Sequence, residues 1–429
     1  MGKFRLKNLY LNNKVLHRFG HNLRHNFIGL KCDLATISKF RKQNNIKYNN
    51  SRIKVVFLAQ YIPAWNKTEP VYSRMLLDDR FEPIIVCVPN ELPEDIKQIS
   101  VNDTYEYFVE NGYDVINAVQ DNNSWFDLRK IYPDYVFYSR PYNYKFPSCY
   151  HSDKVSEYSK ICMLSYAMTL LEEVAETTLK TSFYKDVYCY FAETKYAAKI
   201  IKNKFPITRL LGLRKVKLFG MPALEGMVKN TKGNSPAWDF TNLSFKVIWT
   251  PRWTTDKKLG GTNFFMYYES ILEYAKNNTD TALLLRPHPL MFDNFIESGE
   301  MTREAVEDYC DKISHLDNVS LDKEKEYVET LYDTDVMVTD ISGIMPEFFV
   351  TGKPVIFCDT NIGAQLAPHT KKMVEGCYVA SSEVELYKYL DDLKQGKDPM
   401  KEKRISVIRK VFGKSLNNST ELILEELTN

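Results

Sequence analysis

The feature that most constrains the fold is a regular alternation of short apolar runs with helix-like stretches, which begins at Arg52. Such runs are typical of strands buried on both faces of a parallel sheet. Repeated strand–helix units imply a parallel sheet covered by helices, so the pattern predicts an α/β fold class. The expected strands of the first half are Lys54–Ala59, Pro83–Val88, Tyr135–Tyr138, Cys162–Tyr166 and Val216–Gly220. Those of the second half are Lys246–Thr250, Ala282–Arg286, Asn318–Leu321, Val336–Thr339 and Val355–Cys358.

The alternation breaks between Gly220 and Thr241, where glycines and prolines replace the periodicity. We interpret this stretch as a linker. The predicted units are then an extension at 1–50, an α/β domain at 51–220, the linker at 221–242, a second α/β domain at 243–398 and a helical tail at 399–429. Two doubly wound, Rossmann-like domains that face a cleft form a GT-B-like architecture, and two substrates would meet in that cleft.

The extension is basic, whereas the rest of the chain is mildly acidic. Residues 1–50 hold eleven Lys and Arg and one acid, Asp33, and their net charge of +10 contrasts with −8 for residues 51–429. Apolar residues at positions 9, 16, 23 and 30 share one face if the segment is helical. Two readings are open: a surface helix on anionic lipid, or a basic helix packed on the body of the protein or on a partner.

The compartment follows from what the sequence lacks. No apolar run approaches the ~20 residues that span a bilayer, and the N-terminus has no apolar signal-peptide core. The eight cysteines form no C-x-x-C pair, which argues against a zinc site or a disulfide framework. We therefore expect a cytoplasmic protein that is peripheral on the inner face of the plasma membrane, and we expect no nucleic-acid partner.

Two of the expected strands end in polar residues. The stretch Leu283–Pro289 reads LLLRPHP and supplies Arg286 and His288, and the stretch Val336–Glu347 reads VMVTDISGIMPE. In open α/β sheets, ligands bind beyond the carboxyl ends of strands, and a helix start favours an anion. A guanidinium, an imidazole and a helix start together predict a phosphate or diphosphate site.

The second half resembles the CDP-glycerol glycerophosphotransferase family of teichoic acid and capsule synthesis. Val247–Trp253 resembles the family's strand that ends in a Pro-Thr-(Trp/Phe)-Arg turn, and Arg286–Pro289 resembles its Arg-x-His motif. Thr339–Gly343, with Glu347, is similar to its Thr-Asp-Tyr-Ser-Ser-x-x-x-Asp motif, which Lys353–Phe357 continues. The similarity covers roughly residues 245–360.

The resemblance implies that these residues bind the diphosphate and nucleotide of a CDP-activated donor, with no further cofactor. His288 and Arg286 are then catalytic, and the implied donor-binding residues are Pro251, Arg252, Asp340, Ser342, Gly343 and Glu347. Alternatives exist: Arg286 in an ion pair with an acid of the next helix, or Glu347 as a solvated acid instead of a ribose ligand. Asp340 and Ser342 could also brace the turn and cap the helix.

The sequence departs from the family on the acceptor side. Arg252 stands where the family usually has Thr, and Gly343 replaces the second serine. The family's His-Gly-Thr-Pro-x-Lys motif, which supplies its proposed base, is absent; Ile161–Ala167 occupies that region. A replacement base is expected, because a base contributes ~10²–10⁴-fold. Glu69 and His151 are the candidates, with a helix N-terminal acid and a surface histidine as the ordinary alternatives.

A bound metal is not expected. Asp333 and Asp335 match the D-x-D pattern of metal-dependent glycosyltransferases, but they precede a strand, where Asp is an ordinary loop residue. Positive charge from Arg286, Arg252, His288 if protonated and a helix start of roughly +0.5 charge would offset the diphosphate. The sequence therefore predicts metal-independent transfer.

Three functions remain after this reading. The first is transfer of a polyol phosphate, with glycerol phosphate as the expected group, from a CDP-activated donor to a hydroxyl of a cell-surface glycan or lipid-linked precursor, with release of CMP. The second is a GT-B glycosyltransferase that uses a nucleotide sugar for capsule or cell-wall polysaccharide. The third is a non-catalytic nucleotide-binding module.

Overall fold

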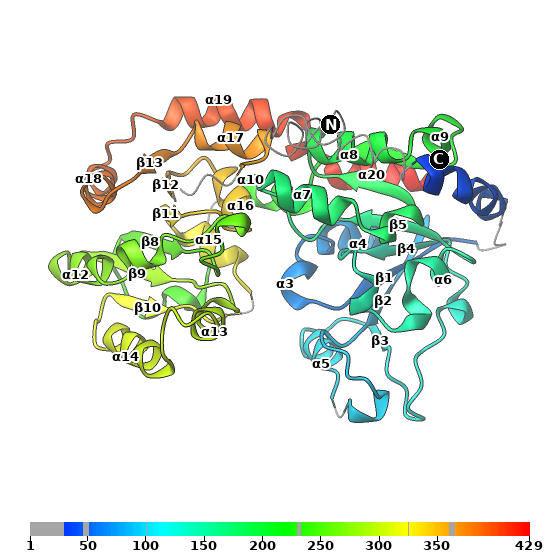
Figure 1. The fold of residues 1–429 in the computed structure, drawn as a ribbon, viewed down its shortest axis with the longest axis horizontal. Coiled ribbons are helices and arrows are strands. Elements are labelled where there is room, and N and C mark those ends of the chain that lie inside the picture. The colour runs from blue at the N-terminus through cyan, green and yellow to red at the C-terminus, as the bar shows by residue number, and fades with distance from the viewer. Residues whose placement is uncertain (1–29, 46–50, 100, 230–232, 325, 360–364) are drawn as a thin grey trace, which may run out of the picture.

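The structure is a computed structural model that describes residues 30–45, 51–99, 101–229, 233–324, 326–359 and 365–429. It contains two parallel sheets that lie side by side, each flanked by helices (Figure 1). We call the first sheet, with the helices between its strands, the first lobe, and the second sheet, with its helices, the second lobe. None of the helices in the described ranges is long and apolar enough to cross a membrane.

The first sheet has seven strands within the described residues, in the order β3-β2-β1-β4-β5-β6-β7. Its strands are β1 (Ile53–Ala59), β2 (Phe81–Cys87), β3 (Val115–Asn117), β4 (Tyr135–Tyr138), β5 (Lys160–Leu164), β6 (Val187–Ala192) and β7 (Lys215–Leu218). β1 pairs in parallel with β2 on one side and β4 on the other. The order therefore reverses between β1 and β4, which makes this point the topological switch.

Helices cover both faces of the first sheet because neighbouring residues of each strand point to opposite sides. They are α3 (Ile62–Trp65), α4 (Glu69–Leu76), α5 (Asp103–Glu110), α6 (Ser152–Val155), α7 (Glu172–Leu179), α8 (Lys195–Lys204) and α9 (Pro206–Leu210). Short 3-10 turns lie at Ile96–Gln98, Leu128–Ile131, Asn143–Lys145, Ser148–Tyr150 and Ser182–Lys185. Val55 and Phe57 pack with α4 and α5, whereas Val56 and Leu58 pack with α7 and α8.

The second sheet repeats this plan in the order β10-β9-β8-β11-β12-β13. Its strands are β8 (Phe245–Thr250), β9 (Thr281–Leu285), β10 (Val319–Leu321), β11 (Val336–Thr339), β12 (Val355–Cys358) and β13 (Tyr378–Ala380). β8 pairs in parallel with β9 and β11, so the order reverses between β8 and β11. The predicted α/β class, with two doubly wound sheets, is confirmed.

Two helical layers enclose the second sheet. Its helices are α11 (Phe264–Tyr267), α12 (Ser270–Asn277), α13 (Met291–Glu297), α14 (Arg303–Ser314), α15 (Val328–Asp333), α16 (Met345–Phe349), α17 (Pro368–Val374) and α18 (Glu383–Lys394). Short 3-10 turns lie at Pro236–Trp238 and Lys257–Leu259. Val247 and Trp249 pack with α12, α14 and α18, and Ile248 packs on the opposite face with α15, α16 and α17.

The stretch expected to be a linker contains a helix, α10 (Pro222–Lys229). Leu224 and Met227 of this helix are buried in the core that also holds Ile248 and Phe348 of the second lobe. Its apolar residues had been obscured by Gly226 and the flanking prolines in the sequence pattern. The connection between the lobes is therefore packed on the second lobe.

The tail is helical, as predicted, and returns to the first lobe. It comprises α19 (Lys401–Val411), a turn at Gly413–Leu416 and α20 (Ser419–Thr428). In Figure 1 the red tail runs from the second lobe across to the first. Ile423, Leu424 and Leu427 of α20 are buried with Val55 and Phe57 of β1. The chain end thus completes the core of the lobe in which the chain began.

The described part of the basic extension packs on the first lobe. Residues 30–44 are helical, and Phe40 is buried. Asp33 accepts the backbone N–H of Ile207 at 2.6 Å, at the start of α9, and Lys39 pairs with Asp186 at 2.9 Å. For these residues the structure favours packing on the body over lipid binding. The rest of the apolar stripe, at positions 9, 16 and 23, lies outside the described residues.

Candidate active site in the cleft between the lobes

Three loops meet at the carboxyl edge of the second sheet. The order β10-β9-β8-β11 places the loop after β8 between the loops after β9 and β11. Arg286 directly follows β9, Arg252 lies just beyond the end of β8, and Asp340 directly follows β11. The residues expected to form an anion site therefore come from adjacent strands, because parallel strands present all their carboxyl ends at one edge.

Arg286 is paired with an acid. Its Nη1 donates to Oδ2 of Asp322, which follows β10, and its Nη2 donates to the carbonyl of Glu324 at 2.8 Å. The guanidinium also lies over the ring of Tyr327, 5.0 Å from the ring centroid. The ion pair considered as an alternative is thus present, with an acid of the β10 loop in place of one from the next helix. Because Asp322 offsets its charge, Arg286 orders this loop and contributes less net charge to the site.

His288 is a neutral hydrogen-bond donor at neutral pH. Its ring lies beside Trp253, with 5.9 Å between ring centroids, and its Nδ1 accepts the backbone N–H of Leu290 at 3.2 Å. The residue reaches solvent, but the protein around its ring desolvates it, and this effect and the charge of Arg252 lower the pKa of His288 to about 4. With Nδ1 occupied as an acceptor, the neutral ring carries its proton on Nε2.

Arg252, at this same edge, forms no ion pair with any of the described carboxylates. Its Nη1 donates to the carbonyl of Ile341 at 2.5 Å, and its Nε is buried without a described hydrogen-bond partner. Burial lowers its pKa, and the charge of Asp340 opposes this shift. Pro251 is buried before it and fixes the direction of the loop. The guanidinium therefore retains donor capacity for an anion.

Asp340 holds the β8 loop to the sheet. Its Oδ2 accepts the hydroxyl of Thr262 and the backbone N–H of Asn263, both at 3.1 Å. Its Oδ1 is buried without a described partner. Burial raises the pKa of Asp340 to about 6, against the opposing effects of its hydrogen bonds and Arg252. Asp340 thus braces the loop that carries Arg252.

The helix start expected at Ser342 and Gly343 lies further along the chain. α16 begins at Met345, its N-cap is Ile344, and no side chain caps it. Ser342 therefore does not cap this helix, and its N–H instead donates to the carbonyl of Asp340 at 3.0 Å. A helix of five residues has only a small macrodipole. The positive charge of the site then rests on arginine side chains.

Glu347 is a buried bridge between the lobes. It is 2% exposed, its Oε1 accepts Nζ of Lys67 at 2.5 Å, and its Oε2 accepts the hydroxyl of Tyr327 at 2.8 Å. Asn66 of the first lobe also donates to the hydroxyl of Tyr327, at 2.9 Å. The solvated-acid alternative is therefore wrong, and both carboxylate oxygens that a ribose would need already have partners.

The first lobe adds an arginine and two tyrosines to the cleft. Arg140 follows β4, its Cζ lies 5.0 Å from the ring centroid of Tyr61, and its Nε is buried without a described partner. Burial raises the pKa of Tyr61, and the charges of Arg140 and Arg286 oppose the shift. The charge of Arg140 also opposes the rise that burial causes in the pKa of Tyr166. Groups from both lobes therefore act on the same hydroxyl.

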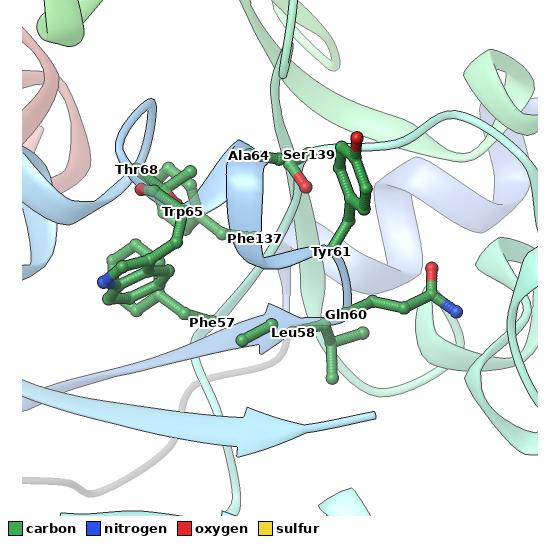
Figure 2. Close-up of a pocket in the computed structure, with 10 residues that line it drawn as sticks. Phe57, Leu58, Gln60, Tyr61, Ala64, Trp65, Thr68, Phe137 and Ser139 are labelled. Carbon is green, nitrogen blue, oxygen red and sulfur yellow. The ribbon is translucent and has the colours of Figure 1, made fainter. Parts of the chain in front are cut away.

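A small cavity lies at the switch point of the first sheet, beneath α3. Figure 2 shows Phe57, Trp65 and Phe137 gathered on one side of it and Tyr61 and Ser139 on the other. Its volume is about 10 Å³, which is roughly the space of one water molecule. It is too small for a nucleotide.

The chain matches the family model described as CDP-glycerol:poly(glycerophosphate) glycerophosphotransferase over residues 173–429. This match covers more than half of the sequence. The chain belongs to this family. It is therefore a transferase of the glycerophosphotransferase family, and no curated protein matches it.

Solved structures similar to this chain share its two-lobed architecture. A variant of the wall teichoic acid polymerase TagF with CDPG has a TM-score of 0.58 at 13% identity and covers 96% of this chain and 97% of that chain. MnaA of S. aureus with UDP has a TM-score of 0.56 at 14% identity, with 88% and 96% covered. UDP-GlcNAc 2-epimerase from Neisseria meningitidis has a TM-score of 0.55 at 14% identity, with 88% and 100% covered. The expected GT-B-like fold is confirmed.

The structure places the two candidate bases, Glu69 and His151, at different helices of the first lobe. Glu69 lies in the first turn of α4 and accepts the hydroxyl of Ser73. His151 precedes α6, with its Nε2 3.1 Å from the carbonyl of Phe146; Figure 1 places α6 on the flank of the first lobe that is remote from the second. The position of His151 therefore gives it no access to a donor held at Arg252.

The carboxylates of the D-x-D sequence, Asp333 and Asp335, accept hydrogen bonds from backbone N–H groups. Asp333 accepts the N–H groups of Gly233 and Ser235, and Asp335 accepts the N–H of Lys246 at 2.8 Å. Within the described ranges, no group of three or more His, Cys, Asp or Glu is arranged to hold a metal. Their loop lies at the amino end of β11, opposite the edge that carries Arg252.

Three site residues are absent from the expected set. Arg140 lies two residues beyond the end of an expected strand, so the strand-end criterion that selected Arg286 could have found it. Glu193 follows β6, which is not among the expected strands. It lines a cavity of about 130 Å³ together with Arg252. Lys67 is recognisable only from its contact with Glu347 across the cleft.

Proposed function

We propose that this protein moves glycerol phosphate from CDP-glycerol to a hydroxyl of a cell-surface glycan or lipid-linked precursor, with release of CMP, in teichoic acid or capsule synthesis. The observation that carries the proposal is the convergence of Arg252, Arg286 and His288 at the carboxyl edge of the second sheet. The family to which the chain belongs supplies the donor class.

The reaction is a displacement at phosphorus. The acceptor oxygen attacks the β-phosphorus of the donor, the bond from this phosphorus to the bridging oxygen breaks, and CMP leaves with the electron pair. Negative charge grows on the diphosphate oxygens as this happens. Donors fixed in place before the reaction stabilise such charge. Arg252 provides unpaired N–H groups, and His288 provides its Nε2–H as a neutral donor.

The charge account differs from the one expected from the sequence. Asp322 offsets Arg286, His288 is neutral, and α16 is short. Arg252 and Arg140 form no ion pair with a described carboxylate. In the proposed reaction, these two arginines supply the positive charge that offsets the donor diphosphate. We keep metal-independent transfer as a proposal on this revised basis.

A thermal-shift screen tests the donor class. CDP-glycerol, CDP-ribitol, CMP-sugars and UDP-sugars are each added to the full chain, and a ligand at about 100 times its dissociation constant stabilises by ~2.7 kcal/mol. We expect CDP-glycerol to give the largest shift and Arg252→Ala to lose it. Arg129→Ala is the matched control, because Arg129 is exposed and pairs only locally with Asp127.

The other outcomes decide between the remaining functions. A preferred UDP-sugar would replace the proposal with a nucleotide-sugar glycosyltransferase. A shift with CDP-glycerol but no CMP release with any polyol phosphate, glycan or lipid-linked acceptor would indicate a binding module. No shift with any CDP compound would remove the donor assignment.

A further inference from the structure

Glu193 is a buried carboxylate without a cation. It directly follows β6, at the carboxyl edge of the first sheet, and is 7% exposed. The hydroxyl of Tyr190 donates to its Oε2 at 2.6 Å, and the hydroxyl of Thr169 donates to its Oε1 at the long distance of 3.5 Å. No Lys, Arg or His in the described part of the chain forms an ion pair with it. Oε1 therefore has capacity for a further donor.

The burial of this carboxylate without a paired cation lowers the stability of the fold. Taking a carboxylate out of water without a paired cation is unfavourable. The burial raises the pKa of Glu193, while the hydroxyls of Tyr190 and Thr169 oppose the shift. A buried acid with a raised pKa that lies in a cleft is a functional-site candidate. For comparison, the buried Glu347 is fully paired with Lys67.

Glu193 opens onto a cavity that both lobes build. The cavity measures about 130 Å³; the first lobe contributes Glu193, Tyr142 and Tyr166 to its wall, and the second contributes Arg252 and Gly343. A hydroxyl group bound beside Glu193 would thus lie between the first sheet and the residues that we assign to the donor diphosphate. Gly343 has open space where a Cβ would be, which leaves this entrance free.

The two lobes hold this cavity together through backbone contacts. The N–H of Ala367 donates to the carbonyl of Leu170 and the N–H of Glu172 donates to the carbonyl of Gln365, both at 2.8 Å. These bonds join the loop before α7 to the loop before α17. The loop that carries Thr169 is therefore fixed between Glu193 and the second lobe, so the cavity is preformed.

We propose that Glu193 is the general base of the transfer and that the acceptor hydroxyl binds in this cavity; the assignment rests on the proposed function. The hydroxyl proton moves to Oε1 of Glu193 as the acceptor oxygen forms its bond to the β-phosphorus. The phosphorus–oxygen bond to CMP breaks, and CMP carries the electron pair away. Glu193 then loses the proton to solvent, and its carboxylate is restored.

The pH profile has a definite sign. The base acts in its ionised form, so turnover rises with pH as Glu193 loses its proton, at a pH above the usual range of glutamate. The charged and titratable groups around it are Tyr190 of its own strand, Tyr184, whose pKa Glu193 helps to raise, and, across the cavity, Tyr142, Tyr166 and Arg252. Tyr184 and Tyr190 remain protonated well beyond this range because burial raises their pKa values.

Glu193→Gln is the decisive variant. It keeps an acceptor for Tyr190 but cannot accept the proton. We expect CMP release to fall by about 10²–10⁴-fold, loss of the acidic limb of the pH profile, and an unchanged thermal shift with CDP-glycerol. The melting temperature should stay the same or rise, because the unpaired charge is gone. Glu193→Asp, which retains a shortened base, should recover part of the rate.

Glu225→Gln is the matched control. Glu225 is also 7% exposed, but it accepts the backbone N–H of Thr420 at 2.8 Å and lies in α10. This variant should transfer at close to the wild-type rate. Two results would overturn the assignment of Glu193 and leave the proposed function standing. One is transfer by Glu193→Gln within threefold of the wild-type rate; the other is a lower melting temperature of this variant together with loss of its thermal shift with CDP-glycerol. No transfer by the wild-type chain would overturn the proposed function and the assignment with it.

Discussion

Asp340 shows how a single residue couples the site to pH. Its folded-state pKa of about 6 exceeds its usual value of 3.8, so the folded protein binds more protons than the unfolded chain between these values. Stability therefore falls as pH rises from about 4 to about 6. The full penalty, on the order of 3 kcal/mol, applies above pH 6.

Asp340→Asn should remove this penalty. The amide oxygen still accepts from Thr262 and Asn263, but the side chain no longer ionises. Urea unfolding at pH 4 and pH 8 is the measurement. We expect similar stability of variant and wild type at pH 4 and a more stable variant at pH 8. A difference between them that does not depend on pH would contradict this reading.

At the residue scale, the sequence predicts the strand-end residues and not their partners. Arg286 and His288 are visible because both follow a short apolar run that is typical of a buried strand. Asp322 and Lys67 come from loops that the fold brings near, and local patterns carry no record of such contacts. This is why the sequence predicts neither the pairing of Arg286 with Asp322 nor that of Glu347 with Lys67.

At the scale of elements, the β8 loop depends on Gly260. Its φ is +100°, and a Cβ there would lie 2.9 Å from Cδ1 of Ile341, 3.2 Å from Cδ1 of Leu171 and 3.3 Å from Nε of Arg252. Gly260→Ala therefore combines backbone strain of about 1–3 kcal/mol with displacement of Arg252. We expect lower stability by chemical denaturation and a weaker thermal shift with CDP-glycerol.

Gly112→Ala provides the matched control for that prediction. Gly112 has φ of +77°, but nothing lies within 4 Å of its Cβ position. It should lose some stability through strain and keep the full shift with CDP-glycerol. Equal effects of the two substitutions on donor binding would show that crowding of Arg252 is unimportant.

Residues 1–29 carry the remaining membrane prediction. They hold six Lys and Arg and no acid, and each basic residue near an anionic surface adds ~1 kcal/mol. We expect the full chain to sediment with anionic vesicles and not with neutral ones. The triple variant Lys3→Gln, Arg5→Gln and Lys7→Gln should bind less. Equal sedimentation of the two proteins would contradict the prediction.

The elements themselves follow from the sequence where burial is continuous. β4 and β11 have the expected bounds, because each is a fully buried apolar run. β3 and β13 have three residues each, too few to show a period. The side chain of Asn102 caps α5, and a break at Tyr268 and Glu269 separates α11 from α12. Element ends are set by local hydrogen bonds that a periodicity does not encode.

At the scale of the whole molecule, a buried ion pair joins the lobes. Lys67 and Glu347 are 3% and 2% exposed. Removal of one partner of such a pair costs about 3–5 kcal/mol, whereas an apolar replacement of both can be nearly neutral. A double-mutant cycle with Lys67→Met and Glu347→Leu should show large single losses and a much smaller loss in the double variant. Additive losses in denaturant unfolding would exclude coupling across the cleft.

The two-lobed architecture is predictable because two series of strand–helix units separated by a break allow few other arrangements. The way in which the two lobes contact each other cannot be predicted from the sequence pattern. The contact between Lys67 and Glu347 joins positions 280 residues apart, and the return of α20 to β1 depends on shape complementarity that apolar content alone does not specify. The cavity beside Glu193 is a product of this closure.

The most direct test of the central claim is the rate of CMP release from CDP-glycerol, with acceptor, in the presence of EDTA. The account predicts turnover by the wild-type chain under chelation and a loss of about 10²–10³-fold in His288→Ala, because a fixed donor to the developing charge is removed. His315→Ala, at the exposed end of α14, should match the wild type. Near-wild-type turnover by His288→Ala, or activity that disappears with EDTA and returns with Mg²⁺, would contradict the account.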